Sequence, residues 1–208
     1  MRREIAIEKA RRKLEFPNYN VIRKEGMILR NPLTKINCEL LKGWEQVSLL
    51  IIDLGNYEKS RSFSNTNPAP KLKLSDVVNI PQFCYDYGQL AAFNILFGVR
   101  DRNEGNYVFF TDKQILYSID NEDGPFDSNG HDAGISYIVD ETVRHIKNFI
   151  PKENMPKYLS HLRSGFVNGW NKIKDSMEYL DMFQSLEIDR TCRLLTENPV
   201  TLAESIFS

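Results

Sequence analysis

The chain has 208 residues, a formal net charge of -1 and 41% hydrophobic residues, a composition that supports a buried core and argues against wholesale disorder. The near-neutral charge provides no broad positive field, so nucleic acid is not expected as a partner. Basic residues gather in segments 1–13 and 71–73, which we interpret as solvated surface.

The cysteines and the apolar runs exclude several classes of protein. Cys38, Cys84 and Cys192 are far apart and form no CxxC pair, so neither a structural zinc site nor a disulfide framework is expected. Segment 1–16 is charged throughout and lacks the apolar stretch of a secretory signal. The longest apolar run, residues 47–52, is far shorter than the roughly 18 residues that cross a bilayer. We therefore expect a cytoplasmic protein without a transmembrane segment.

The first predicted element is an amphipathic helix over residues 3–16. Ala6, Ala10 and Leu14 share one stripe of this helix, and lysine and arginine occupy the other face. Pro17 is expected to end it.

Short strands separated by turn signals are predicted after this helix. Their expected positions are residues 20–23, 27–30 and 36–41, with turns at Glu25-Gly26 and Asn31-Pro32 and a buried strand at residues 47–52. Segment 57–73 is rich in Ser and Asn and carries Pro68 and Pro70, so we interpret it as a mobile connection. The strongly apolar segment 82–97 predicts a buried helix, which Gly98 would end.

The second half of the chain predicts a loop, two strands and then helices. The loop covers residues 101–106, and strands at 107–110 and 115–119 follow with a turn at 111–114 between them. From Tyr137 onward the pattern is helical, with breaks at Pro151 and Pro156.

One arrangement among these elements fits phosphoryl transfer. Asp101 and Asn106 share a loop that enters a strand, and Asp120 follows the next strand. Phosphoryl transfer needs a carboxylate near the accepting hydroxyl and oxygen ligands for the Mg²⁺ ions that bridge the phosphates. Asp101 can serve the acceptor, while Asn106 and Asp120 can hold the metal. The alternative is structural, because the same residue types are common in polar turns and at strand ends.

Segment 89–126 also resembles a known family. Its two motifs read Gly98-Val99-Arg100-Asp101-Arg102-Asn103-Glu104-Gly105-Asn106 and Ile119-Asp120-Asn121-Glu122. They are similar to the Asp-Arg-x-x-x-Asn loop and the metal-binding strand end of atypical protein-kinase-like proteins, the phosphatidylinositol 3-/4-kinase-like and HipA-like family. The resemblance implies a kinase-like C-terminal lobe, ATP and Mg²⁺ as cofactors, and catalytic roles for Asp101 and Arg102. It also implies that Asn106 and Asp120 are Mg²⁺ ligands.

The chain departs from that family on the side that grips the nucleotide. It has no glycine-rich phosphate loop, and Glu122 stands where the family has glycine. The first helix resembles the one that carries the family's ion-pairing glutamate, with Glu4 or Glu8 in that role. Lys24 and Lys42 lie beside strand-like segments and are candidate ATP-binding residues, or else ordinary surface lysines.

These features together predict an α+β, protein-kinase-like fold. A reduced N-terminal lobe with a small antiparallel sheet is expected in residues 1–56, a linker in 57–80, and a mostly helical C-terminal lobe in 81–208. The expected activity is Mg-ATP-dependent phosphoryl transfer to a hydroxyl. A protein acceptor is favoured over a lipid because no basic-aromatic surface for anionic membranes stands out. Two alternatives are a non-catalytic, kinase-derived binding module (a pseudokinase) and a half-site that a partner chain completes.

Overall fold

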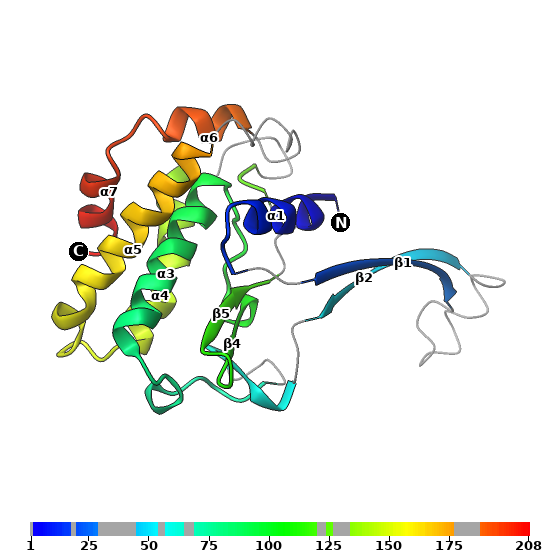
Figure 1. The fold of residues 1–208 in the computed structure, drawn as a ribbon, viewed down its shortest axis with the longest axis horizontal. Coiled ribbons are helices and arrows are strands. Elements are labelled where there is room, and N and C mark those ends of the chain that lie inside the picture. The colour runs from blue at the N-terminus through cyan, green and yellow to red at the C-terminus, as the bar shows by residue number, and fades with distance from the viewer. Residues whose placement is uncertain are drawn as a thin grey trace. The chain divides into compact units, whose positions relative to one another are not determined.

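The computed structural model describes residues 2–17, 20–28, 45–53, 57–64, 69–119, 124–126, 134–176 and 188–208. Within these ranges the fold is α+β, with six α-helices and a three-stranded antiparallel sheet in the larger of two compact units (Figure 1). The larger unit comprises residues 1–18 and 56–208, and the smaller comprises residues 19–55. The division into lobes at 1–56, 57–80 and 81–208 stays a prediction.

The smaller unit contains an antiparallel pair of strands, β1 (Asn20–Ile28) and β2 (Glu45–Asp53). Pairing is continuous along β1 and passes through Gly26, which lies opposite Val47. The turn predicted at Glu25-Gly26 is therefore wrong, and the two strands expected on either side of it are one. Glycine adopts extended as well as turn conformations, so its presence alone does not require a turn. The strand predicted at 36–41 lies outside the described residues.

The sheet of the larger unit has the order β3-β4-β5. Its strands are β3 (Ser60–Ser62), β4 (Tyr107–Phe110) and β5 (Ile115–Ser118). The predicted pairing of β4 with β5 is confirmed, and it places Tyr107 opposite Ser118. β3 comes from the segment interpreted as a mobile connection, and it pairs with β4.

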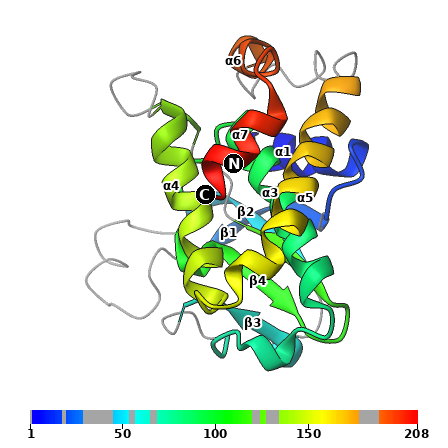
Figure 2. The ribbon, with the colours of Figure 1, turned by 90° about the vertical axis from the view of Figure 1, so that its left-hand side faces the viewer.

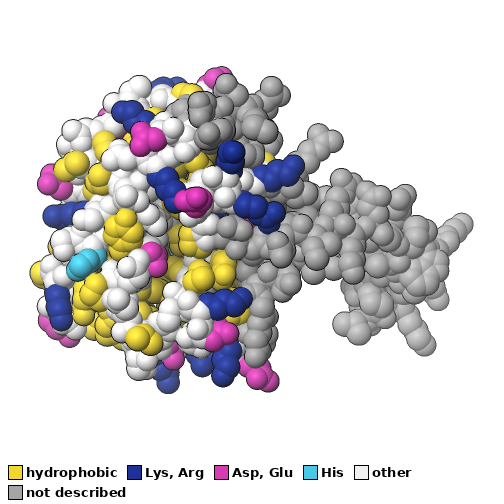
Figure 3. All heavy atoms as spheres, viewed as in Figure 1, with side chains coloured by type: hydrophobic (Ala, Val, Ile, Leu, Met, Phe, Trp, Pro, Cys, Tyr) yellow, Lys and Arg dark blue, Asp and Glu magenta, His cyan; other side chains and the backbone are white. Residues whose placement is uncertain are grey.

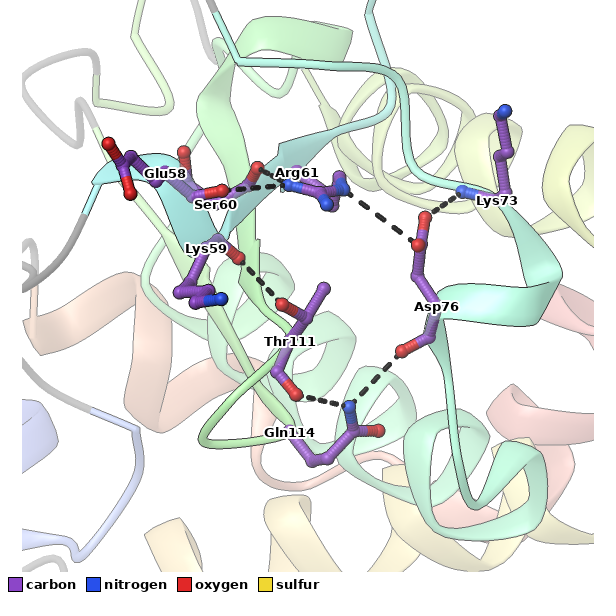
Figure 4. Close-up of polar contacts among 8 residues, drawn as sticks. All are labelled: Glu58, Lys59, Ser60, Arg61, Lys73, Asp76, Thr111 and Gln114. Atoms are coloured by element: carbon purple, nitrogen blue, oxygen red, sulfur yellow. Dashed lines mark hydrogen bonds and ion pairs between the residues drawn. The ribbon is translucent and has the colours of Figure 1, made fainter.

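The described parts of that segment are held to the sheet by polar contacts (Figure 4). Thr111 Oγ1 donates to Lys59 O at 3.1 Å, and Gln114 Nε2 donates to Asp76 O at 3.1 Å. The Asp76 carboxylate lies 3.8 Å from Arg61 Nε. These residues form a sheet edge flanked by two short turns, η1 (Tyr57–Lys59) and η2 (Leu74–Asp76), and the mobility expected of segment 57–73 stays a prediction.

The helices of the larger unit are α1 (Arg2–Lys13), α3 (Ile80–Leu96), α4 (Gly134–Phe149), α5 (Met155–Asp175), α6 (Ile188–Leu194) and α7 (Pro199–Ile206). α3 packs along α5 and contacts α4, α6 and β5, so it forms the centre of the core (Figure 2). A helix with a wide apolar face is expected to pack against several neighbours in this way. Asn79 starts α3 by accepting the Gln82 N–H at 3.1 Å, and Gly98 follows its end at a φ of +60°.

Helix α1 contributes both apolar and charged groups to the core. Ala6, Ala10 and Leu14 are buried, as predicted. Glu8 and Arg11 are buried as well, with 3% and 0% exposed, so the expectation that basic residues occupy only a solvated face is wrong. The two side chains are paired, with Arg11 Nη1 2.7 Å from Glu8 Oε1, which compensates charge inside the core.

In the view of Figure 3, several lysine and arginine side chains gather beside the residues drawn in grey, and charges of both signs are mixed over the rest of the described surface. Lysine and arginine side chains are interspersed there with aspartate and glutamate side chains. Within the described ranges, no helix is both long and apolar enough to cross a membrane.

Candidate active site

Asp101 and Asn106 lie at the two ends of one turn between α3 and β4. Asn106 Nδ2 donates to Asp101 O at 2.9 Å and to Asp101 Oδ2 at 3.1 Å. Asn103 Nδ2 donates to the other carboxylate oxygen, Oδ1, at 2.9 Å. Asn103 also accepts the Gly105 N–H at 2.8 Å and so starts the turn η3 (Glu104–Asn106).

These contacts determine which way the Asn106 amide faces. Both partners of its Nδ2 are oxygens that only accept, so the nitrogen must lie on their side and Oδ1 on the other. Among the described residues, none donates a hydrogen bond to this Oδ1. An amide oxygen held in this way can ligate a hard cation such as Mg²⁺. The amide oxygen of Asn106 is therefore a suitable ligand for the Mg²⁺ that the sequence implies.

Arg102 ties the loop to the end of β5. Its guanidinium donates through Nη1 to Ser118 Oγ and through Nη2 to Ile119 O at 3.0 Å. Ile119 N in turn donates to Asn106 O at 2.9 Å. Arg102 was expected among the catalytic residues, but its side chain is 0% exposed and bonded within the protein. It positions the loop in this structure, and contact with a substrate would require it to leave this buried place.

Two residues of α4 hold the main chain of Arg102. Glu141 Oε2 accepts the Arg102 N–H at 3.3 Å, and His145 Nε2 lies 2.6 Å from Arg102 O. Because a carbonyl oxygen only accepts, Nε2 is the protonated nitrogen of His145. Burial lowers the pKa of His145 below its usual value of 6.5, so the ring is neutral at neutral pH. Sequence reasoning missed both residues, although their spacing of four places them on one helix face.

The chain beyond β5 returns to the start of the loop. A Cβ added to Gly98 would lie 2.6 Å from Pro125 Cβ, so Pro125 packs directly on this glycine. Ile119 and Pro125 thus flank the undescribed residues 120–123, and both contact the loop that runs from Gly98 to Asn106.

The structure brings Asp101, Arg102 and Asn106 together, but it does not place every predicted site residue. Asp120 and Lys42 lie outside the described residues. Lys24 lies on β1 opposite Leu49, and its side chain is outside the described part. The resemblance-based roles of these three residues stay predictions.

The other candidates for chemistry are structural where they are described. Cys84 is buried on α3, and burial raises the pKa of its thiol to about 12, so it is a core thiol. In the described part of the chain, no group of three or more His, Cys, Asp or Glu side chains could hold a metal ion. A site with one amide ligand and one carboxylate, as predicted for Asn106 and Asp120, is not a group of that kind.

No family model, no curated protein and no solved structure matches this chain.

Proposed function

We propose that this chain is a Mg-ATP-dependent phosphotransferase that acts on a hydroxyl group, with a protein serine or threonine as the acceptor. The observation that carries the proposal is the orientation of Asn106. Its amide nitrogen is committed to Asp101 at 2.9 and 3.1 Å, which leaves the amide oxygen for a cation and aligns the carboxylate beside it. Phosphoryl transfer needs these two groups side by side.

The residues take separate roles in this proposal. Asp101 accepts the proton of the acceptor hydroxyl. The hydroxyl oxygen bonds to the γ-phosphorus of ATP while the bond between that phosphorus and the leaving ADP breaks. Asn106 and Asp120 hold Mg²⁺, which supplies positive charge to the phosphate oxygens when it is bound. Arg102 holds Ile119, the residue before Asp120, against the loop by donating a hydrogen bond to Ile119 O at 3.0 Å.

The assigned roles predict different effects for the two carboxylates. Asp120→Ala should weaken Mg-ATP binding about tenfold or more, because a contact to a charged group contributes roughly 1.5–3 kcal/mol and about 1.4 kcal/mol is a factor of ten. Asp101→Asn should leave that affinity nearly unchanged and lower turnover by about 10²–10⁴-fold. Calorimetry with ATP, in Mg²⁺ and in EDTA, and phosphate transfer to protein acceptors would measure the two effects. Asp175→Asn, an exposed carboxylate at the end of α5, is the matched control.

Three outcomes would separate the alternatives. Equal loss of nucleotide affinity in the Asp101 and Asp120 variants would contradict the division of roles. Mg-ATP binding without turnover on any acceptor would favour the non-catalytic binding module. Absence of Mg-ATP binding by the wild-type chain would overturn the proposal, unless a partner chain restored it and so identified a half-site.

A further inference from the structure

We propose that Arg11 of α1 is a second positioning residue of this site, which with Arg102 holds the end of β5, two residues before Asp120 in the chain. The inference rests on the proposed function. It assigns a role to an arginine of helix α1 that lies 107 positions before its partner, Ser118, in the chain.

The contacts of Arg11 join three elements. Its Nη1 donates to Glu8 Oε1 on the same helix at 2.7 Å, and it also donates to Ser118 O, the last main-chain carbonyl of β5. One nitrogen can make both bonds because it carries two hydrogens. The guanidinium lies 5.0 Å from the centre of the Phe93 ring on α3. Arg11 thus connects α1 and α3 to the strand that leads to Asp120.

Two arginines therefore converge on one residue. Arg11 binds the main-chain oxygen of Ser118, and Arg102 binds its hydroxyl. Glu8, Arg11, Arg102 and Ser118 are all at most 3% exposed, and we refer to these four residues as the Ser118 clamp. In low dielectric such charge-assisted hydrogen bonds are strong and strongly directional.

The place of the clamp in the chain gives it a functional consequence. Ser118 is followed by Ile119, whose N–H and carbonyl are bonded to Asn106 and Arg102 at 2.9 and 3.0 Å. Asp120 is the next residue in the chain. A displacement of Ser118 would therefore act on both predicted metal ligands. Groups that orient metal ligands in this way typically contribute about 10–100-fold to metal affinity.

The test measures the increase in ATP affinity that Mg²⁺ brings, using calorimetry of the full-length chain in Mg²⁺ and in EDTA. Arg11→Met should reduce this increase by about 10–100-fold and leave the affinity in EDTA unchanged. Arg11→Lys should recover part of the loss, because it keeps a cation beside Glu8 without the planar fork. Lys9→Met is the matched control, since Lys9 is an exposed base on the same helix.

Folding is monitored by circular dichroism, so that a structural defect is not mistaken for a positioning effect. If Arg11→Met does not fold, Arg11→Lys takes its place, and it should still lower the Mg²⁺-dependent increase. A folded Arg11→Met or Arg11→Lys chain with a wild-type increase would overturn the inference and leave the proposed function intact. A wild-type chain whose ATP affinity does not respond to Mg²⁺ would overturn the proposed function, and the inference would fall with it.

Discussion

Buried guanidinium groups bind the main chain at two places beside the loop that carries Asp101: the end of α3, where the loop begins, and the end of β5. Arg190 of α6 donates to Ile95 O at 3.0 Å and to Leu96 O at 3.3 Å, at the carboxyl end of α3. Arg11 and Arg102 donate to Ser118 and Ile119 at the end of β5. Carbonyls at the end of a helix lack partners within the helix, and a cation there is favoured by the helix dipole. The loop is therefore held at its entry and, through Arg102, against the end of β5.

His145 predicts how stability depends on pH. Its pKa is lowered by burial, so the unfolded chain binds a proton more readily than the folded chain does. The contribution of neutral His145 to stability is then complete above the usual pKa of 6.5, and it is lost as pH falls below that value. Denaturant unfolding between pH 8 and pH 5 would measure this loss.

The matched variants isolate the contribution of His145. His145→Gln should be less stable at pH 8 by about 1–3 kcal/mol, because Arg102 O loses the donor that lies 2.6 Å away. It should also lose less stability than the wild type on acidification. His161→Gln on α5 is the matched control for the substitution. An unchanged dependence in His145→Gln would show that another group titrates in this range.

At the scale of elements, the pair α3 and α5 forms the core against which the loop and sheet are built. Their close approach depends on glycines in both helices. A Cβ on Gly165 would clash with the main-chain oxygen of Tyr85, and one on Gly88 would clash with that of Leu162. Since main-chain atoms cannot turn aside as a flexible side chain can, the two helices would have to separate.

This contact predicts that Gly165→Ala destabilises the protein in spite of the higher helix propensity of alanine. Overpacking in a dense interior typically costs about 1–3 kcal/mol, whereas the propensity gain is up to about 1 kcal/mol. Ser164→Ala, at the exposed neighbouring position, should be neutral or slightly stabilising. Thermal unfolding of the two variants would compare them directly. A Gly165→Ala chain at least as stable as wild type would mean that α3 and α5 do not approach so closely.

Elements defined by local patterns could be predicted from the sequence. The apolar segment that became α3, the strands β4 and β5, and the glycine that follows α3 all carry their signal within a few residues. β3 could not be predicted, because Ser60–Ser62 shows no apolar alternation and pairs with β4, far along the chain. Its strand state depends on a partner and not on its own residues.

The candidate site also contains residues that the sequence indicates and residues that it does not. The sequence placed Asp101 and Asn106 on one loop, and the structure shows that one short turn brings them into contact. No local signal marks Arg11 as a partner of Ser118, because a basic residue on a polar helix face reads as surface. Only the tertiary packing of α1 against α3 and β5 makes it part of the core.

At the scale of the whole molecule, the groups predicted to bind ATP fall in different compact units. Asp101, Asn106 and Asp120 belong to the unit of residues 1–18 and 56–208, and both candidate lysines belong to the unit of residues 19–55. The larger unit is compact in its own right and contains the buried core around α3 and α5. We therefore expect the larger unit to fold without β1 and β2.

The last prediction concerns a chain in which residues 20–53 are replaced by a flexible Gly-Ser linker. Its larger unit should unfold cooperatively near the wild-type temperature, because the core around α3 and α5 is retained. Its Mg-ATP affinity should fall about tenfold or more, since a lysine–phosphate contact contributes roughly 1.5–3 kcal/mol. Lys24→Met or Lys42→Met in the full chain should reproduce that loss, whereas Lys152→Met, an exposed lysine of the larger unit, should not. Wild-type affinity in the shortened, folded chain would show that neither lysine contacts the phosphates and that the larger unit alone holds the nucleotide.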